Sequence, residues 1–244
     1  GVFPIPMAFV NEVEGSLVRA IVGLRDHGLK QAMGEIDQAL ERNPNFRLGY
    51  MIKGDLLMAR AGLPQVFASR TASVESVAPL QDEARVRLHR YLDAPPVDFL
   101  PASVLQMAPS QAHALVVDTE RSRLFVYAND NGRPRYVTDF YISVGKNGAE
   151  KQREGDQKTP IGVYTIQGMK QKLPDFYGAG AFPLSYPNEW DKRHGRSGFG
   201  IWLHGTPSDT YSRPPRASDG CVVLANQDLD RISATLQAVK ACRL

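Results

Sequence analysis

The sequence predicts an α+β protein, with an N-terminal helical domain, a mainly antiparallel β sandwich or barrel, and a C-terminal helix. Two observations support this class. Apolar residues recur at helical spacing through about the first hundred residues, whereas short apolar runs separated by turn residues follow from about Ser110. Such close-set strands favour antiparallel pairing over alternating βαβ units. We therefore expect residues 1–109 to form a helical domain with a proline-containing connector, and residues 110–244 to form a second, β-rich domain.

The helical region divides into segments at glycine and proline. Apolar side chains at helical spacing run through residues 17–24 and then 29–40, and Pro44 ends this stretch. Residues 46–62 and 83–91 predict two further helices with one apolar face each.

The spacing of small and aromatic residues between Ala32 and Gly54 resembles a tetratricopeptide helical hairpin. Only about one and a half units match, and arrays of such repeats usually need about three units for stability. A plain helical bundle is the alternative interpretation.

The β-rich region is predicted from apolar runs bounded by turn residues. Strands are expected at residues 114–117, 124–127, 136–144, 159–167, 201–203 and 222–224. Asn131 and Gly132 mark a hairpin turn. The polar residues 146–158 predict a loop, and the long irregular segment 174–200 is expected to form a lid over a functional site. A helix that Asn226 caps ends the chain.

Composition and charge exclude several classes of function. The net charge is only +3 and acidic residues are interspersed among the basic ones, so no nucleic-acid partner is expected. No apolar run reaches the ~20 residues that span a bilayer. No glycine-rich phosphate loop follows a strand and no ligand pair is closely spaced, so we expect neither a cofactor nor a metal. The chain begins at Gly1 without a basic-apolar leader, so we expect any signal peptide to be absent from it.

The residues suited to covalent chemistry lie between positions 201 and 226. One apolar run ends at His204 and Gly205, and a second begins after Gly220 and Cys221. A thiol with its ordinary pKa of about 8.5 is only a few per cent thiolate at neutral pH, so a nucleophilic cysteine needs a nearby base. His204 can be that base, and the N–H groups of Gly220 and Cys221 can face a developing oxyanion. From the residues alone, Cys221 could instead be a small core residue or form a disulfide with Cys242.

This stretch resembles the signature of the L,D-transpeptidase (YkuD) family of bacterial cell-wall metabolism. The signature is a His-Gly, a spacer, then Ser/Thr-His-Gly-Cys, an apolar residue, Arg and a nearby Asn. The matching positions are His204, Gly205, Ser218, Gly220, Cys221, Val222 and Asn226. Asp219 stands where His is usual and Val223 where Arg is usual. The segment from Thr159 to Tyr164 is similar to the family's TPxGxF motif, and the resemblance covers roughly residues 112–224.

The resemblance implies a peptidoglycan L,D-transpeptidase of the periplasm or cell envelope, in a family connected with cell-wall biogenesis and cell shape. Cys221 would attack the amide between the meso-diamino acid and the terminal D-alanine of a tetrapeptide stem. His204 would act as general base and then general acid, with its other ring nitrogen held by the Gly205 carbonyl. An amine would then resolve the acyl-enzyme by cross-linking, D-amino-acid exchange or protein attachment.

Six further residues are expected to bind substrate. Ser218 and Asp219 lie beside the nucleophile, and the basic residues Arg213 and Arg216 could hold an anionic substrate terminus. The aromatic residues Tyr186 and Trp202 could line the groove, although core packing explains each of them equally well.

Two rival interpretations stay open. The Ser-Asp-Gly-Cys variant resembles family members that trim stems, which would make the protein an L,D-carboxypeptidase or amidase. From another class, the helical domain could recruit an envelope protein partner while the catalytic fold is vestigial. The joint presence of His204, Gly220 and Cys221 argues against the second rival.

Overall fold

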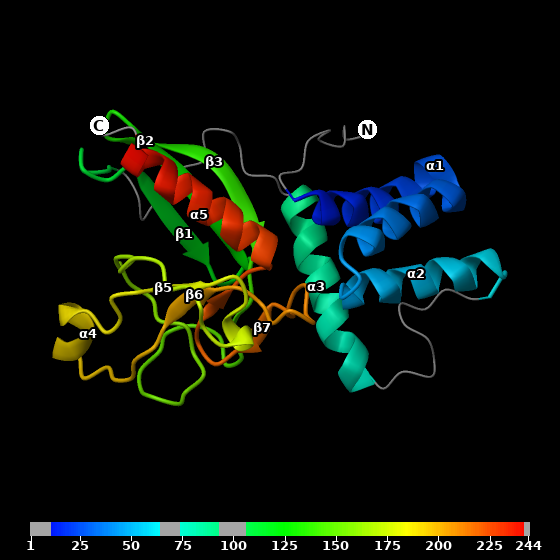
Figure 1. Ribbon diagram of the computed structural model, residues 1–244. Coiled ribbons are helices and arrows are strands. Elements are labelled where there is room, and N and C mark those ends of the chain that lie inside the picture. The colour runs from blue at the N-terminus through cyan, green and yellow to red at the C-terminus, as the bar shows by residue number, and fades with distance from the viewer. Residues whose placement is uncertain (1–10, 64–73, 93–105, 242–244) are drawn as a thin grey trace. The chain divides into compact units, whose positions relative to one another are not determined.

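The computed structural model describes residues 11–63, 74–92 and 106–241. The chain forms two compact units (Figure 1). The first unit comprises Gly1–Ala94 together with Asp209–Pro214, and the second comprises Pro95–Ser208 and Pro215–Leu244. Six residues from the C-terminal half of the sequence therefore belong to the helical unit. The predicted proline connector falls largely on positions outside the described ranges.

Three helices build the first unit: α1 (Glu12–Arg42), α2 (Arg47–Arg60) and α3 (Val74–Leu92). α1 is interrupted at Gly28, whose φ of 80° and ψ of 174° are open to glycine but not to most residues. This interruption separates the two apolar stretches predicted from the sequence. The predicted start of the last helix was wrong, because α3 begins at Val74 and includes Pro79, a residue that usually marks a helix boundary.

A buried ionic cluster connects α1 and α3. The Arg87 guanidinium donates to Glu14 on α1 at 3.0 Å and to Glu83 on α3 at 2.9 Å. Burial raises the pKa of Glu83, and the positive charge of Arg87 opposes that effect. Removing one partner would leave a buried charge uncompensated, so the cluster fixes how α1 and α3 pair.

The segment Asp209–Pro214 is held inside the first unit by two side chains. The Tyr211 hydroxyl and the Asn11 side chain exchange hydrogen bonds at 3.0 and 3.2 Å, and the Tyr211 ring packs edge-on against Phe46 at 4.8 Å between centroids. The Ser212 hydroxyl donates to Glu83 at 2.7 Å. This segment is thus docked by a buried aromatic ring and by the ionic cluster.

The second unit begins with an antiparallel sheet in the order β1-β2-β3. Its strands are β1 (His113–Asp118), β2 (Arg123–Asp130) and β3 (Arg133–Tyr141). Asn131 and Gly132 connect β2 to β3 with φ values of 52° and 89°. Two consecutive positive φ angles are typical of a type I′ turn, so the turn predicted from this dipeptide is present.

Short strands form the remaining sheets of this unit. β5 (Ala181–Pro183) pairs antiparallel with β6 (Trp202–His204), which pairs in parallel with β8 (Val222–Val223). β4 (Val144–Gly145) pairs in parallel with β7 (Arg216–Ser218). The predicted class, mainly antiparallel with an N-terminal helical region and a C-terminal helix, is therefore confirmed.

Two strand predictions were wrong in detail. The run 136–144 is divided, because the chain leaves β2 after Tyr141 and Ser143 bridges to Val223 instead. The run 159–167 forms only isolated bridges, at Thr159 and Ile166. Its apolar alternation is misleading, because Val163 is 87% exposed and faces no sheet partner.

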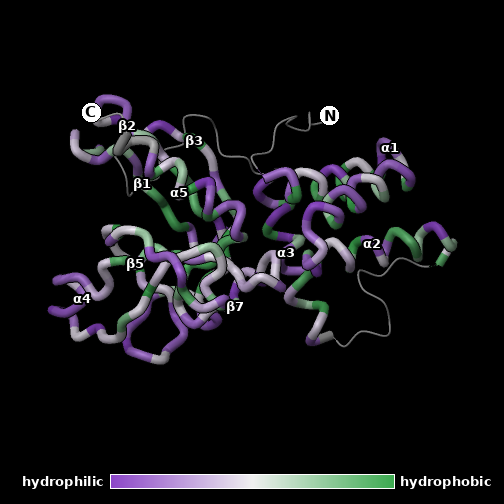
Figure 2. Tube along the Cα trace, viewed as in Figure 1, coloured by the Kyte–Doolittle hydropathy of each residue, from purple (hydrophilic) through white to green (hydrophobic). Residues whose placement is uncertain are grey.

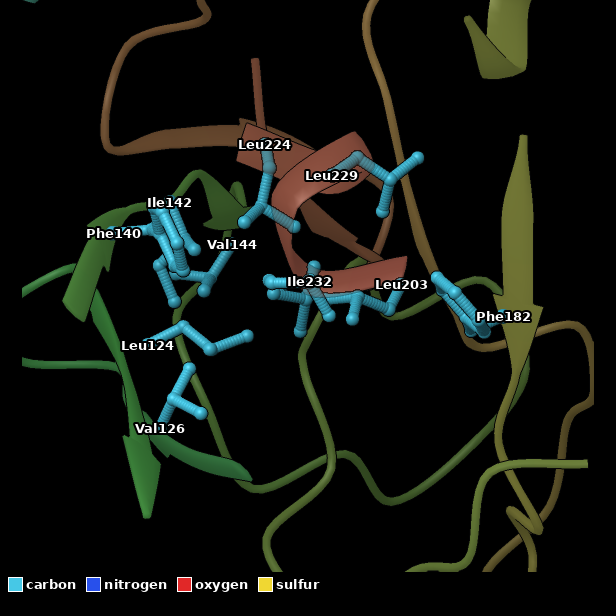
Figure 3. Close-up of a cluster of buried hydrophobic side chains, with 11 residues drawn as sticks. Leu124, Val126, Phe140, Ile142, Val144, Phe182, Leu203, Leu224, Leu229 and Ile232 are labelled. Atoms are coloured by element: carbon cyan, nitrogen blue, oxygen red, sulfur yellow. The ribbon is translucent and has the colours of Figure 1, made fainter. Parts of the chain in front are cut away.

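The helix α5 (Asn226–Ala241) completes the core of the second unit. Leu229 and Ile232 of this helix join one cluster with Leu124 of β2 and Leu203 of β6, as Figure 3 shows. Figure 2 shows β1 as mainly hydrophobic and the short helix α4 (Glu189–Arg193) as mainly hydrophilic. The core thus joins the strands that carry the candidate site to the first sheet.

Candidate active site

The pairing of β6 with β8 places His204 and Cys221 on the same face of a sheet. Leu203 pairs with Val222, and both side chains lie in the core. Because successive side chains of a strand alternate between faces, their neighbours His204 and Cys221 both point away from that core. His204, at the end of β6, and Cys221, directly before β8, are 17 positions apart and are thereby brought to the same side.

The Cys221 thiol lies against the segment that leads into β6. The Trp202 N–H donates to Sγ at 3.4 Å, and the thiol donates to the Gly200 carbonyl at 3.4 Å. Within the described part of the chain Cys221 is a thiol and not half of a disulfide, and Cys242 lies outside that part.

His204 is 1% exposed, and its tautomer follows from one contact. Nδ1 lies 2.7 Å from the Gly205 carbonyl oxygen, which can only accept a hydrogen bond. In the neutral ring Nδ1 therefore carries the proton and Nε2 carries the lone pair. The rings of Phe176 and Tyr177, from the 3-10 turn η1 (Asp175–Tyr177), contact the imidazole at 5.7 and 5.2 Å. The geometry supplies a base with a fixed orientation.

The Asn226 side chain fastens the loop that follows His204. Its Oδ1 accepts from the N–H groups of Ala179 at 2.9 Å and Thr206 at 3.2 Å, and its Nδ2 donates to the Thr206 carbonyl at 2.9 Å. A Cβ at Gly205 would stand 2.0 Å from this Oδ1, and one at Gly178 would stand 2.1 Å from it. Only glycine fits at these two positions. The sequence analysis assigned Asn226 as a helix cap and as a position of the family signature, but it predicted none of these contacts.

The turn that carries Cys221, the candidate nucleophile, is held by two hydroxyl groups. Ser218 Oγ donates to the Cys221 carbonyl at 2.6 Å and accepts from the Gly220 N–H at 3.1 Å. Thr159 Oγ1 donates to the Gly220 carbonyl at 3.0 Å and accepts from the Gly145 N–H at 2.9 Å. The Gly220 N–H thus donates to Ser218. It could donate to an oxyanion only if it shared or broke that hydrogen bond. Ser218 was predicted to bind substrate, and its observed contacts are with this turn.

Asp219 presents a carboxylate at the surface next to this turn. Its Oδ1 accepts from Lys146 Nζ at 3.0 Å and from Gln157 Nε2 at 2.8 Å. Asp219 is 69% exposed and Lys146 is 50% exposed, measured on their side chains. A cation and an anion therefore stand side by side near the nucleophile and face solvent.

The loop 146–158 is ordered around one carboxylate. Asp156 accepts from Lys151 Nζ at 2.8 Å and from the N–H groups of Gln152, Arg153 and Lys158 at 2.7, 3.0 and 3.1 Å. Burial acts to raise the pKa of Asp156, but these donors outweigh it and hold the pKa well below its ordinary value. The loop therefore has a defined shape, which its polar composition did not predict.

Of the aromatic residues predicted to line a groove, only one is near the reactive pair with part of its ring accessible. Trp202 is half-buried, its ring lies 4.9 Å from that of Tyr177, and Lys170 Nζ lies 5.0 Å above it. Tyr186 is buried and its hydroxyl donates to the Ser197 carbonyl at 2.9 Å. Its contacts indicate packing within the segment 174–200.

The two arginines predicted to hold an anionic terminus belong to different units. Arg216 is exposed on β7 of the second unit. Arg213 belongs to the first unit, where it lines a cavity of about 360 Å³ with Arg47, Leu48 and others.

The segment 174–200, predicted to be a lid, is fastened by a buried carboxylate. Asp191 forms a capping box with Asn188 at the start of α4, and Arg196 lies 3.3 Å from it. The imidazole of His194 stacks on Trp190 at 4.0 Å at the end of this helix. Among the residues that the structure describes, no cluster of three or more His, Cys, Asp or Glu could hold a metal ion, and no helix is long and apolar enough to cross a membrane.

Comparison with known proteins gives consistent matches. The YkuD family profile, described as the L,D-transpeptidase catalytic domain, matches residues 112–240. YafK of Escherichia coli (strain K12), which carries a provisional L,D-transpeptidase name, is 35% identical over 128 residues, or 52% of this chain and 48% of YafK. The chain spans about half the length of the curated relatives it matches.

Two solved structures of one protein are also similar. Both are of the helical cell shape determining protein Pgp2 from Campylobacter jejuni. A lysine-to-alanine variant gives a TM-score of 0.51 at 31% identity over 55% of this chain and 46% of that chain. The other Pgp2 structure gives a TM-score of 0.50 at 31% identity over 55% of this chain and 47% of that chain.

Proposed function

Because the chain belongs to the L,D-transpeptidase catalytic domain (YkuD) family, we propose that it is a cysteine acyltransferase acting on peptidoglycan tetrapeptide stems. One observation carries the proposal. His204 and Cys221 lie on the same face of paired strands, and the Gly205 carbonyl leaves the imidazole lone pair on Nε2. A thiol and an oriented base are the parts that acyl transfer requires.

The reaction begins with proton transfer from the Cys221 thiol to His204 Nε2. The thiolate attacks the carbonyl carbon of the amide between the meso-diamino acid and the terminal D-alanine, and the carbonyl oxygen becomes an oxyanion. The Cys221 N–H would donate to that oxyanion, and the Gly220 N–H can join it if Ser218 releases its bond. The C–N bond then breaks, His204 returns its proton to the leaving amine, and D-alanine departs from a thioester.

The second half of the reaction resolves the thioester. His204 takes a proton from an acceptor amine, which attacks the thioester carbon and expels the Cys221 thiolate. The product is a cross-link, an exchanged D-amino acid or an attached protein. The exposed guanidinium of Arg216 supports this outcome. Arg216 lies two residues before Ser218, where it can bind a carboxylate of the donor or the acceptor.

Hydrolysis is the second candidate, in which water takes the place of the amine and the protein is an L,D-carboxypeptidase or amidase. The Ser-Asp-Gly-Cys sequence supports it, because this variant resembles family members that trim stems and because Asp219 itself is exposed to solvent. Under either outcome we place the protein in the periplasm or cell envelope, with a role in cell shape suggested by its likeness to Pgp2. The helical unit would serve as the contact for an envelope protein partner.

The test supplies purified tetrapeptide stems with and without a D-amino acid. Intact-mass measurement should show an acyl adduct on the parent protein and none on Cys221→Ala. Exchange product that appears only with the D-amino acid supports transfer, whereas tripeptide alone under both conditions supports hydrolysis. Absence of any adduct and of any product with all stems would overturn the proposed function.

A further inference from the structure

The exposed ion pair of Lys146 and Asp219 is fixed to the nucleophile turn by the backbone. The Lys146 N–H donates to the Ser218 carbonyl at 2.8 Å, where β4 and β7 run side by side. Asp219 is the residue between Ser218 and Gly220. Since one residue spans at most about 3.6 Å of chain, the Asp219 α-carbon lies within about 7 Å of that of Cys221.

Stability does not explain this pair well. An ion pair with both partners this exposed contributes about 0–1 kcal/mol. The two charges and the Gln157 amide are held by different strands and loops, yet they meet at one carboxylate oxygen. Such an arrangement offers a ligand one acceptor and two donors at a defined place.

The substrate of the proposed reaction has a matching group. The side chain of its meso-diamino acid ends in a second α-carbon that carries an ammonium and a carboxylate. Three methylene groups separate this zwitterionic centre from the α-carbon whose carbonyl Cys221 attacks. An extended chain of four C–C bonds spans about 5 Å, which lies within the bound of about 7 Å on the separation of the Cys221 and Asp219 α-carbons.

We propose that Asp219 and Lys146 recognise the zwitterionic end of the diamino acid side chain. The Asp219 carboxylate accepts from the substrate ammonium, while the Lys146 ammonium, with Gln157, donates to the substrate carboxylate. The existing ion pair is exchanged for two intermolecular pairs of the same kind, so no charge is left uncompensated. This inference rests on the proposed function and names its specificity-determining residues.

The test compares three stems that differ only in the third residue: meso-diaminopimelate, L-lysine and L-norleucine. Lysine lacks the side-chain carboxylate, and norleucine lacks both the carboxylate and the ammonium. We expect Lys146→Gln to lower kcat/KM about 10- to 100-fold on the diaminopimelate stem and to leave the lysine stem nearly unchanged. Asp219→Asn should lower kcat/KM on the diaminopimelate and lysine stems and leave the norleucine stem nearly unchanged.

Lys192→Gln is the matched control. Lys192 forms an equally exposed ion pair with Glu189 on α4 at 2.8 Å, so its loss removes the same type of charge and contact. It should change none of the three values of kcat/KM.

A purely structural role predicts a different pattern. If the pair only holds the loop 146–158 against the turn at Cys221, both variants will lower kcat/KM on all three stems by one common factor. That result would overturn this inference and leave the proposed function standing. Equal kcat/KM of the parent on the three stems would overturn it as well. If no stem is turned over or acylates Cys221, the proposed function fails and the inference fails with it.

Discussion

Replacing Asn226 by alanine should destabilise the second unit and slow acylation together. The change deletes the three hydrogen bonds from this side chain to Ala179 and Thr206. At about 1 kcal/mol for each bond, we expect a loss of about 3 kcal/mol in the free energy of unfolding. For a unit of this size that loss lowers the melting temperature by roughly 6–12 °C.

The effect on chemistry follows from what these bonds fasten. Thr206 follows Gly205, whose carbonyl orients the imidazole of His204. When this loop loosens, the base is displaced from the thiol, and a displacement of about 1 Å can cost on the order of 10²-fold in rate. We therefore expect acylation of Cys221 to slow by about 10- to 100-fold.

Denaturant unfolding gives the first quantity and intact-mass kinetics of acylation give the second. Asp230→Ala is the control, because Asp230 is exposed on the same helix and should leave both values unchanged. A loss of stability below about 0.5 kcal/mol in Asn226→Ala would refute the reasoning. So would a large loss of stability at an unchanged rate of acylation, because it would separate the loop from the orientation of the base.

Four further outcomes are expected. His204→Ala should keep the fold, measured by circular dichroism, while acylation falls by about 10²–10⁴-fold; an unchanged rate would reject its role as base. The pKa of Asp156 is held below that of an unfolded aspartate, about 3.9, so its ionised carboxylate stabilises the fold fully above that pH and loses this effect as the pH falls further. The difference in free energy of unfolding between the parent and Asp156→Asn should therefore shrink as the pH is lowered. A difference that grew in acid would contradict this reasoning. Gly205→Ala should lower the free energy of unfolding by more than about 2 kcal/mol, as overpacking of a core does, because the new Cβ clashes with the Asn226 side chain. The loss should be smaller in a protein that already carries Asn226→Ala, and denaturant unfolding of both variants measures it. Additive losses would argue against the clash. Residues 110–244 alone should restore the envelope of cells that lack the protein less well than the whole chain does. Equal restoration by both would remove the role assigned to the helical unit.

The sequence predicted best those features whose cause is local. The Asn131-Gly132 turn was found because two adjacent residues determine it, and the apolar runs around Leu203 and Val222 predicted the strands that carry the reactive pair. Some local patterns gave wrong predictions. The helix around Arg87 was predicted to begin at residue 83, because proline usually marks a helix boundary, but α3 begins at Val74 and includes Pro79. Alternating apolar residues around Val163 predicted a strand where no partner strand runs.

The features that were missed depend on contacts between distant residues. Thr159 touches Gly220 from 61 positions away, and Asn226 reaches Ala179 across 47 positions. A single polar residue on a loop leaves no periodic signal, so neither contact could be inferred without the fold. The motifs included Thr159, Ser218 and Asn226, but the sequence did not predict which backbone groups these side chains hold.

The placement of Asp209–Pro214 in the helical unit bears on how this chain can be inherited and rearranged. The polypeptide passes from one unit to the other three times, after Ala94, Ser208 and Pro214. A single recombination at the sequence border would therefore join a new N-terminal module to a catalytic module that still carries six residues fitted to the old one. Tyr211 would then lose the Phe46 ring and the Asn11 amide that receive it. Exchange of the helical module should succeed in nature, or in a laboratory chimaera, only when the spacer between His204 and Cys221 is exchanged with it.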